Sequence, residues 1–128
     1  MLEFSDKDIL RGKVISPDWY RVQIDEFEEK LSKDGQSTNF NYEGTVISNA
    51  SNGDTEFANV PVRWNFNSKA KGYMIGFLAV FGITVEKGKR YDLSAFIGKQ
   101  LDIFVENEIY ENRMINKINH KYRALRDS

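Results

Sequence analysis

The chain has 128 residues, of which 41% are apolar and 29% charged, and its formal net charge is −1, values typical of one soluble globular domain. The absence of cysteine excludes disulfides, zinc–thiolate sites and cysteine nucleophiles, and it favours a cytoplasmic location. The sequence contains neither a signal-peptide core nor the roughly 20-residue apolar run that a membrane span requires. We therefore expect a single domain over residues 1–128 that has no contact with a membrane.

The first half of the chain predicts an arm followed by three strands. Residues 1–16 contain few apolar residues and precede Pro17, so we expect them to form a loosely packed arm. From Trp19 onward, apolar and polar residues alternate with the period of a half-buried strand. Turn sequences at residues 33–35 and 49–54 separate the strands. The inward residues of the three strands are, in order, Tyr20, Val22 and Ile24, then Phe40, Tyr42, Gly44 and Val46, then Val62, Trp64 and Phe66.

The apolar period then changes to that of a helix. One apolar face over residues 69–81 consists of four residues at helical spacing: Met74, Phe77, Leu78 and Phe81. We expect Asn67 or Ser68 to cap the start of this helix and Gly82 to close its end. A further short turn is predicted over residues 93–97.

Two more strands complete the predicted fold. Leu101, Ile103 and Val105 alternate inward in the fourth strand, and a hairpin turn near Glu111-Asn112 leads into a last strand over residues 113–122. Five strands with one helix between the third and fourth is the element order of the OB barrel. We therefore predict a mainly β fold, a five-stranded OB-type barrel whose open end is filled by the helix. In such a barrel we expect the last strand to close against the first.

The charges are distributed unevenly along the chain. Residues 1–112 hold 13 Lys and Arg against 18 Asp and Glu, a balance of −5. Residues 113–126 hold five basic residues and no acidic one, and a second acid-free segment spans residues 57–85. Such asymmetry is typical of a surface that faces a polyanion, and a solvated tail and loop explain it equally well.

The sequence gives weak support for an enzyme. His120 is the single histidine, and without a second histidine or a cysteine it is a poor metal ligand or catalytic base. An acidic run could imitate a magnesium site, but Asp102 and Glu106 alternate with Ile103 and Val105, so we expect them on the wet face of a strand. The glycines form no phosphate-binding pattern. We predict a protein that is not an enzyme and needs no cofactor or metal.

The residues give better support for nucleic-acid binding. Single-strand binders of the OB type combine a basic groove with aromatic side chains on which bases stack. Trp19 and Phe104 have outward parity and are candidates for stacking, although packing under loops or against the arm is an equal alternative. The expected barrel closure would bring basic residues of the last strand beside them. The predicted nucleic-acid-binding residues are Trp19, Arg21, Arg63, Lys69, Lys71, Phe104, Arg113, Lys117, Lys121 and Arg123.

Several segments together resemble a known family. The motifs are PDWYRVQI at residues 17–24, VRWNFN at 62–67, GFLAVFG at 76–82 and IGKQL at 97–101. They are similar to small phage-encoded proteins found near replication and recombination genes, several of which bind single-stranded DNA with an OB fold. The resemblance implies the same fold, activity and host-cytoplasmic location, with replication or recombination proteins as partners. The acidic C-terminal tail usual in that family is absent from residues 123–128, which puts tail-mediated recruitment in doubt.

Two hypotheses of function follow. The first is a single-stranded-DNA-binding protein of a bacteriophage that acts in DNA replication or recombination without sequence preference. The second is a protein–protein interaction or assembly module on the same barrel, which the acidity of residues 1–112 favours. An enzyme or nuclease accessory built on the acidic run is a third, remote option. Either of the first two is compatible with an oligomer.

Overall fold

The computed structural model describes residues 1–125. Its elements are α1 (Asp6–Arg11), β1 (Asp18–Leu31), β2 (Thr38–Asn49), β3 (Pro61–Asn67), α2 (Gly72–Val80), a 3-10 turn (Leu93–Phe96), β4 (Gln100–Tyr110) and β5 (Arg113–Arg123). Neither α-helix of the described residues has the length and apolar character needed to cross a membrane. Arg126 and the end of the tail expected over residues 123–128 lie outside the described residues.

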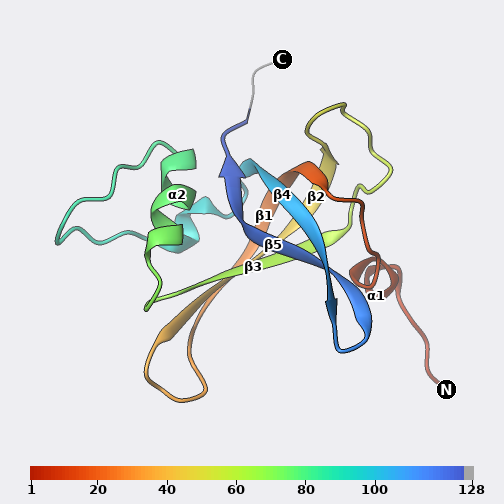
Figure 1. The fold of residues 1–128 in the computed structure, drawn as a ribbon, viewed down its shortest axis with the longest axis horizontal. Coiled ribbons are helices and arrows are strands. Elements are labelled where there is room, and N and C mark those ends of the chain that lie inside the picture. Colours follow the sequence, from red (N-terminus) through yellow and green to blue (C-terminus); the bar gives the residue numbers. More distant parts are fainter. Residues whose placement is uncertain (126–128) are drawn as a thin grey trace.

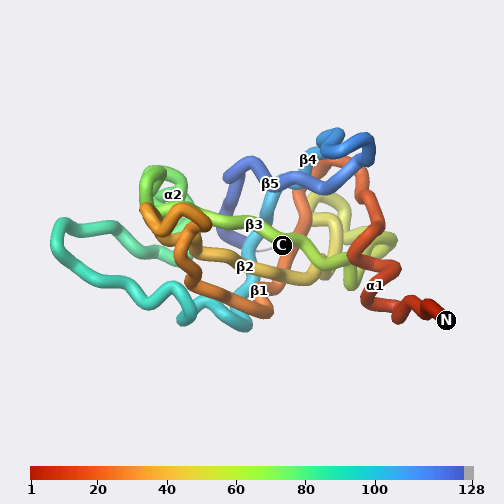
Figure 2. Tube along the Cα trace, turned by 90° about the horizontal axis from the view of Figure 1, so that it is seen from below, coloured from red at the N-terminus to blue at the C-terminus, as the bar shows by residue number. Residues whose placement is uncertain are grey.

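The five strands form one antiparallel sheet in the order β3-β2-β1-β4-β5 (Figure 1). The predicted mainly β class is confirmed, as is a helix between the third and fourth strands. The central strand is β1, which pairs with β2 along most of its length and with β4 through residues 18–23. Figure 2 shows the N-terminal arm with α1 at one end of the sheet, and α2 with the loop that follows it at the other end.

The sheet bends where β1 and β2 approach closely. A Cβ atom added to Gly44 would lie 2.6 Å from both a side-chain carbon of Val22 and the carbonyl oxygen of Gln23, so only glycine fits. Irregularities in the β1–β2 register follow Arg21 and Ile24, and such bulges bend a strand. This curvature brings β3 and β5, the two ends of the sheet, near each other.

The curled sheet is nevertheless open between β3 and β5, which form no hydrogen-bonded ladder within residues 1–125. The expectation that the last strand closes against the first is wrong, because β5 pairs with β4. In residues 20–23, both edges of β1 are already occupied by β2 and β4. The last strand therefore has no edge of β1 available to it there.

The core lies between the inner face of the sheet and α2. Phe77 and Leu78 are buried, and the other two residues of the predicted helical face pack against the same core, as expected. The ring centroid of Phe77 lies 5.0 Å from that of Tyr42 and 5.2 Å from that of Phe66. The predicted inward residues of the strands are buried, except for the half-buried Phe40.

Helix α2 is shorter at its start than predicted, because the expected caps bond elsewhere. The side-chain oxygen of Asn67 accepts a hydrogen bond from the backbone N–H of Lys69, and the Ser68 hydroxyl accepts one from the backbone N–H of Thr38. These bonds fix the turn that joins β3 to α2 and tie it to β2. The end of the helix agrees with the prediction, since Gly82 adopts a φ of +77°.

The N-terminal arm is ordered, contrary to the expectation of loose packing. Ser5 and Asp8 form a capping box at the start of α1, which the sequence analysis missed. Further along, Ile15 is fully buried. Its backbone N–H donates to the side-chain oxygen of Asn116, and its carbonyl accepts from the side-chain amide of Asn107, each at 2.9 Å. The arm is therefore bound to the β4–β5 hairpin.

We expect Phe77→Ala to lower the free energy of unfolding by about 3–5 kcal/mol, because it removes a buried ring in contact with the sheet. Tyr73→Ala on the exposed side of the same helix serves as the matched control and should cost far less. Urea titrations followed by circular dichroism measure both values. A loss below about 1 kcal/mol for Phe77→Ala would show that α2 does not anchor the core.

Candidate nucleic-acid interface

Two predicted aromatic residues lie side by side on the outer face of the sheet. Trp19 of β1 stands opposite Phe104 of β4, with ring centroids 5.5 Å apart in an edge-to-face arrangement. Two cations of β5 lie over the rings: the Arg123 guanidinium is 4.1 Å from the Trp19 centroid, and the Lys121 ammonium is 5.2 Å from that of Phe104. We call Trp19, Phe104, Lys121 and Arg123 the aromatic–basic cluster.

A buried carboxylate holds Arg123 in this cluster. Asp102 of β4 stands opposite Arg21 of β1 and Arg123 of β5. The Nε atom of each arginine lies 3.6 Å from a carboxylate oxygen of Asp102, which is only 1% exposed. The prediction that Asp102 lies on a wet face is therefore wrong. It does belong to the outer face, but side chains from both neighbouring strands cover it, and the alternation within one strand cannot reveal such cover.

The two lysines of β5 on this face also have acidic partners. The Lys117 ammonium lies 2.9 Å from a carboxylate oxygen of Glu108, and that of Lys121 lies 3.6 Å from Glu106. All four side chains are at least 35% exposed. Because exposed ion pairs contribute at most about 1 kcal/mol, a phosphate group can replace either carboxylate at little cost.

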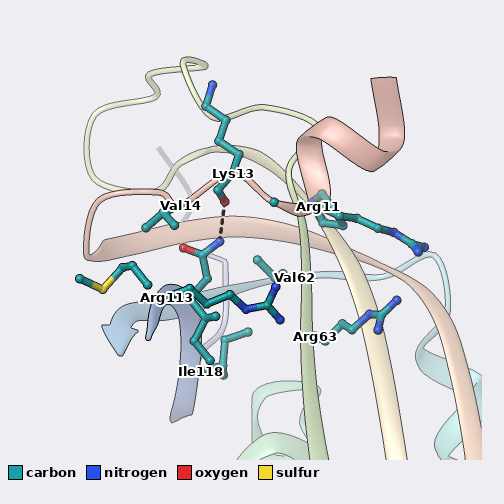
Figure 3. A pocket seen from close by; sticks show the side chains of 12 residues that line it. Arg11, Lys13, Val14, Val62, Arg63, Arg113 and Ile118 are labelled. Atoms are coloured by element: carbon teal, nitrogen blue, oxygen red, sulfur yellow. Dashed lines mark hydrogen bonds between the residues drawn. The ribbon is translucent and has the colours of Figure 1, made fainter. Parts of the chain in front are cut away.

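Arg63 and Arg113 lie away from the aromatic–basic cluster. They line a cavity of about 370 Å³ on the open side of the sheet, between β3, β5 and residues 11–14 (Figure 3). Arg113 begins β5 and Arg123 ends it, so the cavity and the cluster occupy opposite ends of one strand. The predicted residues thus form two sites instead of one.

Arg11 contributes a third guanidinium to this cavity and was not among the predicted residues. A terminal nitrogen of Arg11 lies 3.3 Å from one carboxylate oxygen of Glu43, and a terminal nitrogen of Arg63 lies 3.7 Å from the other. The arm was expected to be loose, so Arg11 was given no role. The Ser5-to-Asp8 capping pattern is the sequence signal that would have placed it at the end of a helix.

Lys69 and Lys71 form neither of these groups and are exposed in the turn before α2. The start of α2 contacts β5 through Tyr73, whose ring stacks on His120 with centroids 4.3 Å apart. His120 occupies an irregular stretch of β5 with a φ of +59°, and its Nδ1 is 2.9 Å from the Tyr122 hydroxyl. Burial lowers the pKa of His120 below its ordinary value of 6.5.

We expect Asp102→Asn to destabilise the fold by about 1–3 kcal/mol, because two partly buried guanidinium groups lose their shared carboxylate. Glu106→Gln is the matched control on the same strand, and it should cost less than about 1 kcal/mol as the partner in an exposed pair. Chemical denaturation at neutral pH measures both. Equal losses for the two variants would contradict the structural role given to Asp102.

The lowered pKa of His120 predicts a pH dependence of stability. Below pH 6.5 the unfolded chain binds a proton at this histidine more readily than the folded chain, so the free energy of unfolding should fall as the pH drops. His120→Asn removes the titrating ring and keeps a residue that tolerates positive φ. Urea titrations at pH 7 and at pH 5.5 should show a smaller drop for the variant than for the wild type. An identical drop in both proteins would contradict this prediction.

The comparisons with known proteins assign no family. No protein-family model matches the chain, and no curated protein is found similar to it in sequence. The resemblance to a phage-encoded family stays a prediction. Within residues 1–125, no three histidine, aspartate or glutamate side chains are grouped so that they could hold a metal ion.

Proposed function

We propose that this chain binds single-stranded DNA without sequence preference, through the outer face of β1, β4 and β5, and that it serves DNA replication or recombination in a bacteriophage. The observation that carries the proposal is the aromatic–basic cluster, a half-exposed pair of rings flanked by cations of one strand. Single-strand binders use this combination because every base has a face that stacks, and every nucleotide carries a phosphate.

The strand arrangement supports an OB-type fold within this proposal. In the sheet, β1 lies between β2 and β4, and the element order places α2 between β3 and β4. An OB barrel is a five-stranded, partly open barrel of this kind. The approach of β3 to β5 is the side at which such a barrel would close.

The mechanism follows from the partners of the cations. Bases stack on the exposed parts of Trp19 and Phe104, and the Arg123 guanidinium adds a further planar surface. Phosphates draw Lys117 and Lys121 away from Glu108 and Glu106, with which they form only exposed pairs. Binding then depends on salt, since each phosphate contact releases counterions.

A second candidate function is protein–protein interaction, which one observation favours. The tip of the β4–β5 hairpin exposes three apolar side chains, Ile109, Tyr110 and Met114, which are 70%, 54% and 46% exposed. Exposed apolar groups at a protruding tip suit contact with another protein. This surface is separate from the aromatic–basic cluster, so variants can distinguish the two functions.

The first test is anisotropy of a labelled oligo-dT, titrated at two salt concentrations. Trp19→Ala should weaken binding roughly 5- to 150-fold, the equivalent of about 1–3 kcal/mol for a lost stacking surface, and leave the salt dependence unchanged. Tyr110→Ala removes an exposed aromatic outside the cluster and should bind as the wild type does. If the wild type fails to bind at low salt, or if only Tyr110→Ala loses affinity, the proposal is wrong.

The second test removes the competing carboxylates. Glu106→Gln together with Glu108→Gln frees Lys121 and Lys117, so affinity for oligo-dT should rise. The slope of log affinity against log salt should steepen by up to about 1.4, or roughly 0.7 for each added phosphate contact on a single strand. Lys117→Gln with Lys121→Gln should shift both quantities in the opposite direction. Unchanged slopes in both double variants would remove these lysines from the interface.

A further inference from the structure

The cavity on the open side of the sheet is enclosed by three separate segments. Its lining comes from residues 11–14 of the arm, from residues 61–63 at the start of β3, and from residues 113–116 and 118 of β5. The arm is fixed there by Asn116, whose side-chain amide donates to the Lys13 carbonyl and whose oxygen accepts from the Ile15 backbone N–H, each at 2.9 Å. The position of Arg11 is therefore set before any ligand arrives.

The charge of this cavity is unbalanced. Arg11, Arg63 and Arg113 each come from a different segment, and the described lining contains no carboxylate. Glu43 lies behind two of them, shared between Arg11 and Arg63, while Arg113 has no ion-pair partner among residues 1–125. Three guanidinium groups thus face one carboxylate. Like charges held together raise the affinity of a cavity for anions.

The orientation of the side chains supports this description. Figure 3 shows Arg113 reaching from β5 toward β3, on which Arg63 lies, and Arg11 extending from the arm on the same side. The Lys13 ammonium points away from the other cations, 5.4 Å from the centroid of Phe57. Only the three arginines therefore present their charges to this side of the cavity.

We propose that this cavity is a phosphate-binding site formed by Arg11, Arg63 and Arg113. Guanidinium groups donate paired, planar hydrogen bonds that match the oxygens of a phosphate, which makes arginine the preferred residue for this ligand. Apolar walls from Val14, Val62 and other lining residues strengthen such contacts by lowering the local dielectric. The phosphate belongs either to a nucleic-acid strand or to a small phosphate compound.

The first source would deepen the function proposed above and rests on it. Residues 113–123 of β5 connect the cavity to the aromatic–basic cluster, over roughly 30 Å at the rise of an extended strand. A strand that stacks on Trp19 and follows β5 would place a phosphate in the cavity. The second source does not depend on DNA binding.

The site is tested first with inorganic phosphate. The melting temperature of the wild type should rise with phosphate concentration relative to sodium chloride at equal ionic strength, because a ligand of the folded state stabilises it. Arg113→Gln should weaken phosphate binding roughly ten-fold or more, as expected for lost hydrogen bonds to a charged group. Arg90→Gln, which changes an exposed arginine of the loop after α2, is the matched control and should respond as the wild type does.

The second arm of the experiment separates the two sources. If a nucleic-acid strand is the ligand, phosphate should compete with oligo-dT, and Arg113→Gln should reduce the salt slope by about 0.7 for the lost contact. If phosphate binds without affecting oligo-dT, or oligo-dT does not bind at all, the site stands with a small phosphate compound as its ligand. Equal melting temperatures in phosphate and chloride, or equal responses of Arg113→Gln and Arg90→Gln, would overturn the proposed site.

Discussion

Both halves of the sheet depend on β1, because it pairs with β2 on one side and with β4 on the other. The strand can do so only if it bends, and the bend requires a close approach to β2 that no residue larger than glycine at Gly44 would allow. Trp19 and Arg21 lie in the stretch that pairs with β4. Their positions relative to Phe104 and Asp102 therefore follow from the same constraint.

The parts of the fold that repeat locally could be predicted from the sequence. Alternation identified the inward residues of the strands, and the helical spacing around Phe77 identified the helix that covers them. The arm could not be predicted in this way, because it is held by hydrogen bonds from Asn107 and Asn116, residues about a hundred positions further along the chain. Its apolar contribution to the core is Ile15, a single residue that sets up no period.

The candidate sites show the same division between local and distant information. Parity correctly placed Trp19, Phe104 and Lys121 on one face, since their side chains contact each other there. Parity could not show which carboxylate would meet which cation, because that depends on the register between strands. The register puts Asp102 between two arginines. It also separates Arg63 from the cluster, since β3 and β4 lie on opposite sides of β1 in the sheet.

The unpaired edge of β5 bears on the choice between the two candidate functions. An open strand edge is a template on which a strand of another protein can add. Here the edge is interrupted by an irregular stretch around His120 and carries basic side chains at Lys117 and Lys121. Bulges and lysines are the features that discourage strand addition. A protein partner would therefore have to use the apolar hairpin tip, while the basic strand itself suits a ligand that brings negative charge and needs no backbone hydrogen bonds. Because β5 joins the aromatic–basic cluster to the three arginines, such a ligand would be long and repeatedly charged, as a single strand of nucleic acid is.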